Sequence, residues 1–147
     1  LTAAELEHDV RFSYTHTAPG DSGVTTNHSF VAKMDRVEQT AGGLFRVIDY
    51  KTGYSSKALK EPAKDDLHLG IYAMDMAFEF NNKSTTPPAG VAEYWILSTG
   101  ERGTIDLAKL DLVRVRSKID EMITGVLTGE FGKGKACRGG CDFLGTL

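Results

Sequence analysis

The 147-residue sequence predicts one α/β domain, in which helices flank a mixed central β-sheet in the order βββαβα. Three observations lead to this class. Apolar and polar residues alternate with a period of two in roughly the first third of the chain. The period then lengthens to nearly four, and one further strand-like segment precedes a last helical segment. A chain of this length can bury a core of its own.

Three strands are expected before the first helix. Residues 6–15 alternate, and a turn-rich segment follows them. Residues 28–39 form the second expected strand, and the segment TAGG turns the chain into the third, at residues 44–52. Because the connections are short, we expect sequential strands to pair as an antiparallel meander.

A helix is expected from about Asp65, with Asp65 or Asp66 as its N-cap. Its apolar face comprises Leu69, Tyr72, Ala73, Met76, Ala77 and Phe80. Residues 91–99 then predict a fourth strand, which ends in the turn GERG. We expect Asp106 to open the last long helix. The apolar residues of that helix would be Leu107, Leu110, Val113, Ile119, Met122, Ile123 and Val126.

Composition excludes several classes of protein. Hydrophobic residues make up 41% and charged residues 25%, and no apolar run approaches the roughly 18 residues that span a bilayer. A net charge of −3 gives no global attraction to nucleic acid or to an anionic membrane, so any phosphate-binding surface has to be local. Two cysteines are too few for a secreted disulfide scaffold, and a cytoplasmic setting is expected.

Three charged residues carry the functional hypothesis. Asp49 and Lys51 project to the same side of the third strand, because strand side chains alternate between faces. The TAGG turn folds Asp35, near the end of the preceding strand, back beside Asp49. Taken alone, an Asp-x-Lys pair at a strand end is more often a solvated ion pair. Two converging carboxylates repel unless a cation lies between them, and hard oxygen ligands suit Mg²⁺ or Mn²⁺.

These segments resemble the PD-(D/E)xK nuclease superfamily, in particular the RecB-like exonuclease domains of helicase–nucleases and their CRISPR-adaptation relatives. That family has a G-x-x-D-R segment, a D-x-K-T-G segment on the next strand, and a helix that begins Q-h-x-x-Y. The corresponding segments here are AKMDR at 32–36, DYKTG at 49–53 and HLGIY at 68–72. The resemblance implies a restriction-endonuclease-like core and a single RecB-like nuclease domain over residues 1–147. We expect it to be a fragment that lacks the family's N-terminal helix.

The resemblance also implies roles for individual residues. Asp35 and Asp49 would bind the metal together with the backbone carbonyl of Tyr50, and Lys51 would be the catalytic lysine. His68 and Tyr72 would contact DNA or orient the site. Ala32 replaces the usual glycine and His68 the usual glutamine. The upstream helix, which brings a further His or Glu to the metal, has no counterpart, and Glu7 is poorly placed for that role.

Other candidates are weaker. Cys137 and Cys141 resemble part of the cysteine cluster that holds a [4Fe–4S] centre in some relatives, but such a centre needs four thiolates. Ordinary thiols are favoured, and a cluster completed outside this sequence is the alternative. Lys57 and Lys60 would rim the site as contacts to DNA phosphates. The remaining candidates are expected to be surface or strand histidines and core aromatic residues: His8, His16, His28, Tyr94 and Trp95.

Two functions from different classes follow. The first is a Mg²⁺- or Mn²⁺-dependent DNA exonuclease that acts in DNA repair or recombination, with DNA and a helicase domain or subunit as partners and no membrane. The alternative is a catalytically lapsed nuclease-fold module that binds DNA or scaffolds a helicase–nuclease complex. Retention of Asp35, Asp49 and Lys51 favours catalysis, whereas the missing upstream ligand and His68 favour the alternative.

Overall fold

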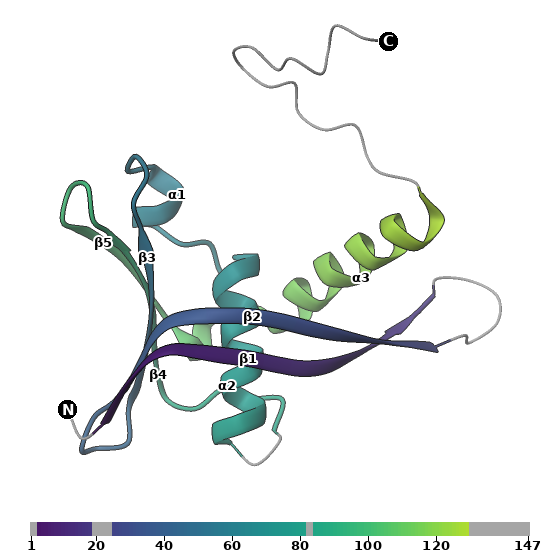
Figure 1. Cartoon of the computed structure of the whole chain (residues 1–147), viewed down its shortest axis with the longest axis horizontal. Helices are drawn as coiled ribbons and strands as arrows, with labels where there is room; N and C mark the ends of the chain where they lie inside the picture. The colour runs from purple at the N-terminus through teal and green to yellow at the C-terminus, as the bar shows by residue number, and fades with distance from the viewer. Residues whose placement is uncertain (1–2, 19–24, 82–83, 130–147) are drawn as a thin grey trace, which may run out of the picture.

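The computed structural model describes residues 3–18, 25–81 and 84–129. Within these ranges a five-stranded sheet packs against helices (Figure 1). The strands are β1 (Ala3–Thr17), β2 (Thr25–Gln39), β3 (Phe45–Lys51), β4 (Gly90–Ile96) and β5 (Glu101–Asp106). The helices are α1 (Lys57–Lys60), α2 (Leu67–Phe80), the 3₁₀ turn η1 (Leu107–Lys109) and α3 (Leu112–Thr128).

The sheet is mixed, as the sequence predicts. The strand order is β1-β2-β3-β4-β5; β3 and β4 are parallel, and the other neighbours are antiparallel. The connection from β3 to β4 carries α1 and α2, because parallel neighbours need a crossover. The predicted meander of three strands is confirmed. The structure adds α1 and β5 to the predicted order, so the expected turn GERG is instead the start of an edge strand with an exposed, polar outer side.

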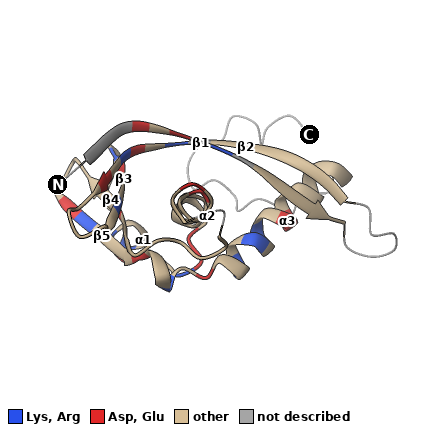
Figure 2. Ribbon diagram, turned by 90° about the horizontal axis from the view of Figure 1, so that it is seen from below, with Lys and Arg blue, Asp and Glu red and all other residues tan. Residues whose placement is uncertain are grey.

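The hairpin of β1 and β2 leaves the sheet after a short shared stretch. β2 pairs with β3 only from Arg36 to Gln39, whereas it pairs with β1 along nearly its whole length. The rest of the hairpin extends across α2 and toward α3 (Figures 1 and 2). At the bend, Glu7 has a left-handed backbone with φ 58°, which is uncommon for a residue with a side chain. The site described below lies where the strands diverge.

The α2 helix forms the centre of the core, between the hairpin and the segment that contains α1 and α3 (Figure 2). Asp66 is its N-cap, as predicted, and accepts a hydrogen bond from the backbone N–H of Leu69 at 3.0 Å. Five of the six residues predicted for the apolar face are buried: Leu69, Tyr72, Ala73, Met76 and Ala77. The sixth, Phe80, lies in the last turn and remains partly exposed.

The last helix starts later than predicted. Asp111, not Asp106, caps α3, and its carboxylate accepts from the backbone N–H of Arg114 at 2.9 Å. Asp106 instead precedes η1 and makes no side-chain cap. Of the apolar residues expected on this helix, Val113, Met122 and Val126 have exposed side chains, because only one side of α3 packs against the rest of the molecule. Among the described helices, none is both long and apolar enough to cross a membrane.

Candidate active site

Asp35 lies at the point where β2 separates from β3. It is the first residue beyond the paired stretch, which begins at Arg36 opposite Ile48. Its Oδ2 accepts a hydrogen bond from the backbone N–H of Tyr50 at 2.6 Å. A strand that loses its neighbour leaves backbone groups without partners, and here the carboxylate supplies the missing acceptor. Asp35 is thereby held beside the strand segment that carries Asp49.

Asp49 and Lys51 lie on the same face of β3, as the strand alternation predicts. The Asp49 side chain is buried under α2 with 7% of its surface exposed, and Lys51 Nζ forms an ion pair with its Oδ2. That oxygen is inaccessible to solvent, yet no hydrogen bond of acceptable geometry reaches it within the described ranges. Lys51 Nζ also lies 5.1 Å from the ring centre of Tyr94, within the range of a cation–π contact.

Two residues of α2 contact the other oxygen of Asp49. The Tyr72 hydroxyl donates to the backbone carbonyl of Lys33 at 2.7 Å and lies 3.4 Å from Asp49 Oδ1. His68 Nε2 lies 2.6 Å from the Tyr72 hydroxyl oxygen and 3.8 Å from Asp49 Oδ1. A phenol has one proton, so when it is donated to Lys33 the hydrogen bond with His68 requires a proton on Nε2.

Tyr72 is a neutral hydroxyl in this environment. Burial, and then the negative charges of Asp49 and Asp35, raise the pKa of Tyr72 far above its ordinary value. The hydroxyl therefore stays a hydrogen-bond donor across the physiological range. It connects the hairpin, the helix and the Asp49 carboxylate at one point.

The donor set fits a divalent cation. Asp35 and Asp49 supply carboxylate oxygens at one sheet edge, and Asp49 Oδ2 is a buried oxygen whose only described partner is the Lys51 ammonium. Hard oxygen donors of this kind suit Mg²⁺ or Mn²⁺, which complete their shells with water and phosphate oxygens. Of the residues named from the sequence, the structure brings together Asp35, Asp49, Lys51, His68 and Tyr72, beside the backbone of Tyr50.

The other predicted contacts lie around this cluster or outside it. Lys57 and Lys60 are on α1, and each faces a carboxylate, Glu61 at 3.7 Å and Glu101 at 3.3 Å. Glu7 is exposed and pairs with Lys33 at 3.0 Å. The Trp95 ring stacks against the guanidinium of Arg102 at 3.9 Å, whereas Tyr94 is in the core. Cys137 and Cys141 lie outside the described residues.

Two of the histidines predicted as surface or strand residues, His8 and His16, lie on strand β1. Both are buried, and each meets a carboxylate of a helix. His8 faces Asp75 and Glu79 of α2. The sequence contained a signal for the contact of His8, because Asp75 is a charged residue in the middle of an otherwise apolar helical run. It contained no signal for the contact of His16, whose partner Asp120 lies more than 100 residues away along the chain.

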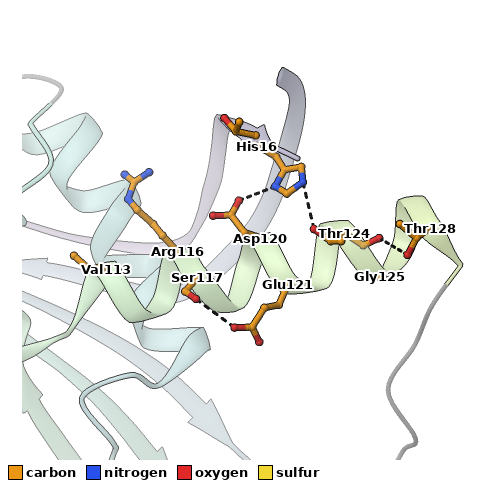
Figure 3. A pocket seen from close by; sticks show the side chains of 10 residues that line it. His16, Val113, Arg116, Ser117, Asp120, Glu121, Thr124, Gly125 and Thr128 are labelled. Carbon is orange, nitrogen blue, oxygen red and sulfur yellow. Dashed lines mark hydrogen bonds and ion pairs between the residues drawn. The ribbon is translucent and has the colours of Figure 1, made fainter. Parts of the chain in front are cut away.

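A separate hollow of about 630 Å³ lies between the end of the hairpin and α3, away from Asp49 (Figure 3). His16 Nδ1 lies 2.8 Å from Asp120 Oδ1, and Nε2 lies 3.4 Å from the Thr124 hydroxyl. Because His16 is almost completely buried, it joins β1 to α3 and does not face solvent as a reactive group.

Among solved structures, the chain is similar to one described as "Crystal structure of SSO0001", with a TM-score of 0.46 and 17% sequence identity over 83% of this chain. It spans 50% of the length of that chain. No protein of curated function matches the sequence. The sequence profile of the PD-(D/E)XK nuclease superfamily matches residues 2–145, nearly the full length. This chain, with its Asp35, Asp49 and Lys51 at one sheet edge, therefore belongs to the PD-(D/E)XK nuclease superfamily.

Proposed function

We propose that the protein is a Mg²⁺- or Mn²⁺-dependent deoxyribonuclease, and that it degrades DNA from its ends. One observation carries the proposal. Where β2 and β3 diverge, Asp35, Asp49 and Lys51 converge, and a buried oxygen of Asp49 lacks a hydrogen bond among the described residues. A lone ion pair would need neither the second carboxylate nor the Tyr72 and His68 contacts to the other oxygen.

In this proposal Asp35 and Asp49 hold the cation, together with the backbone carbonyl of Tyr50. A bound divalent cation would supply charge neutralisation at the phosphate and a more acidic water. Lys51 positions the attacking water and offsets negative charge that builds on the phosphate. The water gives up one proton to solvent as its oxygen forms a bond to phosphorus, one phosphorus–sugar oxygen bond breaks, and the leaving oxygen takes up a proton from solvent.

His68 and Tyr72 keep Asp49 in place. The Tyr72 oxygen lies 3.4 Å from Asp49 Oδ1 and donates its proton to the Lys33 carbonyl, and His68 lies against the Tyr72 oxygen, so the three groups pack around one side of Asp49. A carboxylate held in one rotamer presents its free oxygen to a cation without reorganisation. Because His68 is partly exposed, it is also available to a bound DNA strand. Lys57 and Lys60 would add phosphate contacts from α1.

The test is degradation of linear DNA by the full-length protein with Mg²⁺ or Mn²⁺. We expect Asp49→Asn to lose at least about a hundredfold in rate, because one donor group of the cation site loses its charge. Glu121→Gln is the matched control, since it removes an exposed carboxylate on α3 and should cleave like the wild type. If the protein binds DNA but never cleaves it with either metal, the alternative of a lapsed nuclease-fold module is correct.

Covalently closed circular DNA separates the two modes of cleavage. An exonuclease leaves closed circles intact while it degrades the same sequence after linearisation, whereas an endonuclease cuts both. We propose the first outcome on the strength of the RecB-like order of the AKMDR, DYKTG and HLGIY segments. A role in DNA repair or recombination and a helicase partner are proposed on the same ground.

A further inference from the structure

A second group of metal-ligand residues lies beneath the hairpin, separate from the Asp35–Asp49 cluster. It consists of His8 on β1 and of Asp75 and Glu79 on α2, and we call it the hairpin–helix triad. His8 Nε2 lies 3.0 Å from Glu79 Oε2 and 3.6 Å from Asp75 Oδ2. One ligand atom from each residue falls within 4.8 Å of the others.

Asp75 supplies an independent reason to expect a cation there. It is completely buried, and neither of its carboxylate oxygens accepts a hydrogen bond from any described residue. Its Oδ2 points at His8 Nε2, toward the centre of the triad. Burial, and then repulsion from Glu79, raise the pKa of Asp75 to about 6, although the neighbouring His8 acts in the opposite direction. A buried carboxylate without hydrogen bonds is costly unless a cation compensates its charge.

The separations in the triad match those between ligands of one metal ion. Ligand atoms about 2.0–2.2 Å from a metal are about 3.3–3.6 Å apart across a tetrahedral angle, and about 2.8–3.1 Å apart across a right angle. The two separations from His8 Nε2, 3.0 and 3.6 Å, fall in these ranges. The two distances from His8 are thus those of neighbouring ligands, and the third, between Asp75 and Glu79, is within 4.8 Å.

We propose that the hairpin–helix triad binds one Zn²⁺ or a similar borderline transition-metal ion. An imidazole nitrogen with two carboxylates is a donor set that favours such ions over Mg²⁺, which prefers oxygen ligands alone. With three protein ligands, a water molecule would complete the shell. The ion differs in chemical class from the Mg²⁺ or Mn²⁺ proposed for the nuclease cluster.

The position of the triad indicates what the ion would do. Tyr72, Asp75 and Glu79 follow one another at steps of three and four residues, so they share one side of α2. In the hairpin, His8 lies opposite Met34. The neighbouring residue, Lys33, has the backbone carbonyl that accepts a hydrogen bond from the Tyr72 hydroxyl. The ion would tie β1 to α2 about one helical turn from Tyr72. This positioning role rests on the proposed nuclease function, whereas the ion site itself does not.

The experiment is metal titration of the full-length protein after chelator treatment and dialysis, in an Asp49→Asn background that removes the nuclease cation site. Calorimetry with Zn²⁺ should give one ion per chain, and Co²⁺ should produce visible d–d absorption bands. Glu79→Gln should weaken Zn²⁺ binding at least tenfold and abolish the bands. Glu79 is suitable because it is partly exposed, so its amide is tolerated without refolding of the core. Glu121→Gln is the matched control.

Two results would overturn the proposal. One is the absence of stoichiometric Zn²⁺ binding in the Asp49→Asn protein. The other is equal affinity in the Glu79→Gln and Glu121→Gln proteins. Either would mean that a protonated His8 holds the two carboxylates without a metal. Conversely, if the Asp49→Asn protein binds Zn²⁺ through Glu79 but the wild-type protein cleaves no DNA, this site is retained and only the proposed nuclease function is lost.

Discussion

The two carboxylate oxygens of Asp49 contact different parts of the site. Oδ2 faces Lys51 on its own strand, and Oδ1 faces Tyr72 and His68 on α2. The first contact follows from strand alternation, whereas the second depends on how the helix packs. Substitutions on the two sides should therefore have different kinetic effects, one on the chemical step and one on the placement of Asp49.

Lys51 should matter for turnover and little for DNA affinity. Lys51→Ala is expected to lower kcat by about 10²–10³-fold, because it removes a fixed positive charge at the reacting phosphate. DNA affinity should stay within about threefold, since the ammonium is one phosphate contact among several. Lys51→Arg should not restore turnover, because a planar guanidinium does not replace a compact ammonium. Single-turnover cleavage and filter binding measure the two quantities. If Lys51→Ala cleaves DNA as fast as the wild type, Lys51 has no catalytic role and only forms an ion pair with Asp49.

His68 should be replaceable by glutamine and not by alanine. The side chain amide of glutamine can still donate to the Tyr72 oxygen, so His68→Gln is expected to keep kcat within about threefold. His68→Ala loses a hydrogen bond of about 1 kcal/mol and should cleave about five- to tenfold more slowly. Steady-state kinetics on linear DNA compares the two variants. A glutamine variant as slow as the alanine variant would contradict this role.

At the scale of elements, the position of α1 depends on a close approach to β5. Gly103 is buried in β5, and a Cβ at this position would overlap the backbone carbonyl of Leu59. The overlap is with backbone, so no side-chain rotation relieves it. β5 and α1, the helix that carries Lys57 and Lys60, thus pack directly against each other.

Gly103→Ala should consequently lower the free energy of unfolding by about 1–3 kcal/mol, the usual range for overpacking. Gly42→Ala is the control, because its Cβ would have no neighbour closer than 3.9 Å, and its effect should stay within about 0.5 kcal/mol. Urea denaturation of both variants gives the comparison. If the two variants are equally stable, α1 moves away from β5 without lowering the free energy of unfolding.

At the scale of the whole molecule, Lys118 joins α3 to the start of α2. Its Nζ lies 2.7 Å from Asp65 Oδ2 and donates to the Asp65 carbonyl at 2.6 Å. The hydrogen bond from Lys118 lowers the pKa of Asp65 below its ordinary value. A carboxyl with a lowered folded-state pKa stabilises the protein above its unfolded-state pKa, and this contribution is lost as the pH falls through the folded value.

The difference in stability between wild type and Lys118→Met should therefore shrink on acidification. At pH 7 the variant should be less stable, and the gap should narrow below about pH 4, where Asp65 takes up a proton in the unfolded chain. The control is Lys109→Met, which removes the exposed ion pair between Lys109 on η1 and Asp106 at the end of β5. Urea titrations from pH 7 to about pH 2 test this. If the difference in stability between wild type and Lys118→Met does not change with pH, Lys118 stabilises the protein through its hydrogen bond to the Asp65 carbonyl and not through the ion pair.

The sequence by itself determined the features that depend on near neighbours in the chain. Alternation placed Asp49 and Lys51 on one face, and the TAGG turn returned the chain so that Asp35 lies beside them. The pair Asp65 and Asp66 marked the start of α2, and the structure shows that Asp66 is the cap. Each of these depends on strand period, a short turn or a cap within four residues. The period also identified the buried face of α2, because an apolar stripe needs only its own spacing.

Only the tertiary structure decided which distant groups meet. The hairpin of β1 and β2 crosses α2 (Figure 1), and this placement brings His8 to Asp75 and the Lys33 carbonyl to Tyr72. Tertiary packing also decided that Val113 on α3 is exposed, since an apolar residue is buried only where another element covers it. Such contacts join residues tens of positions apart, so no local period encodes them. They depend on the one packing of hairpin and helices that buries the core.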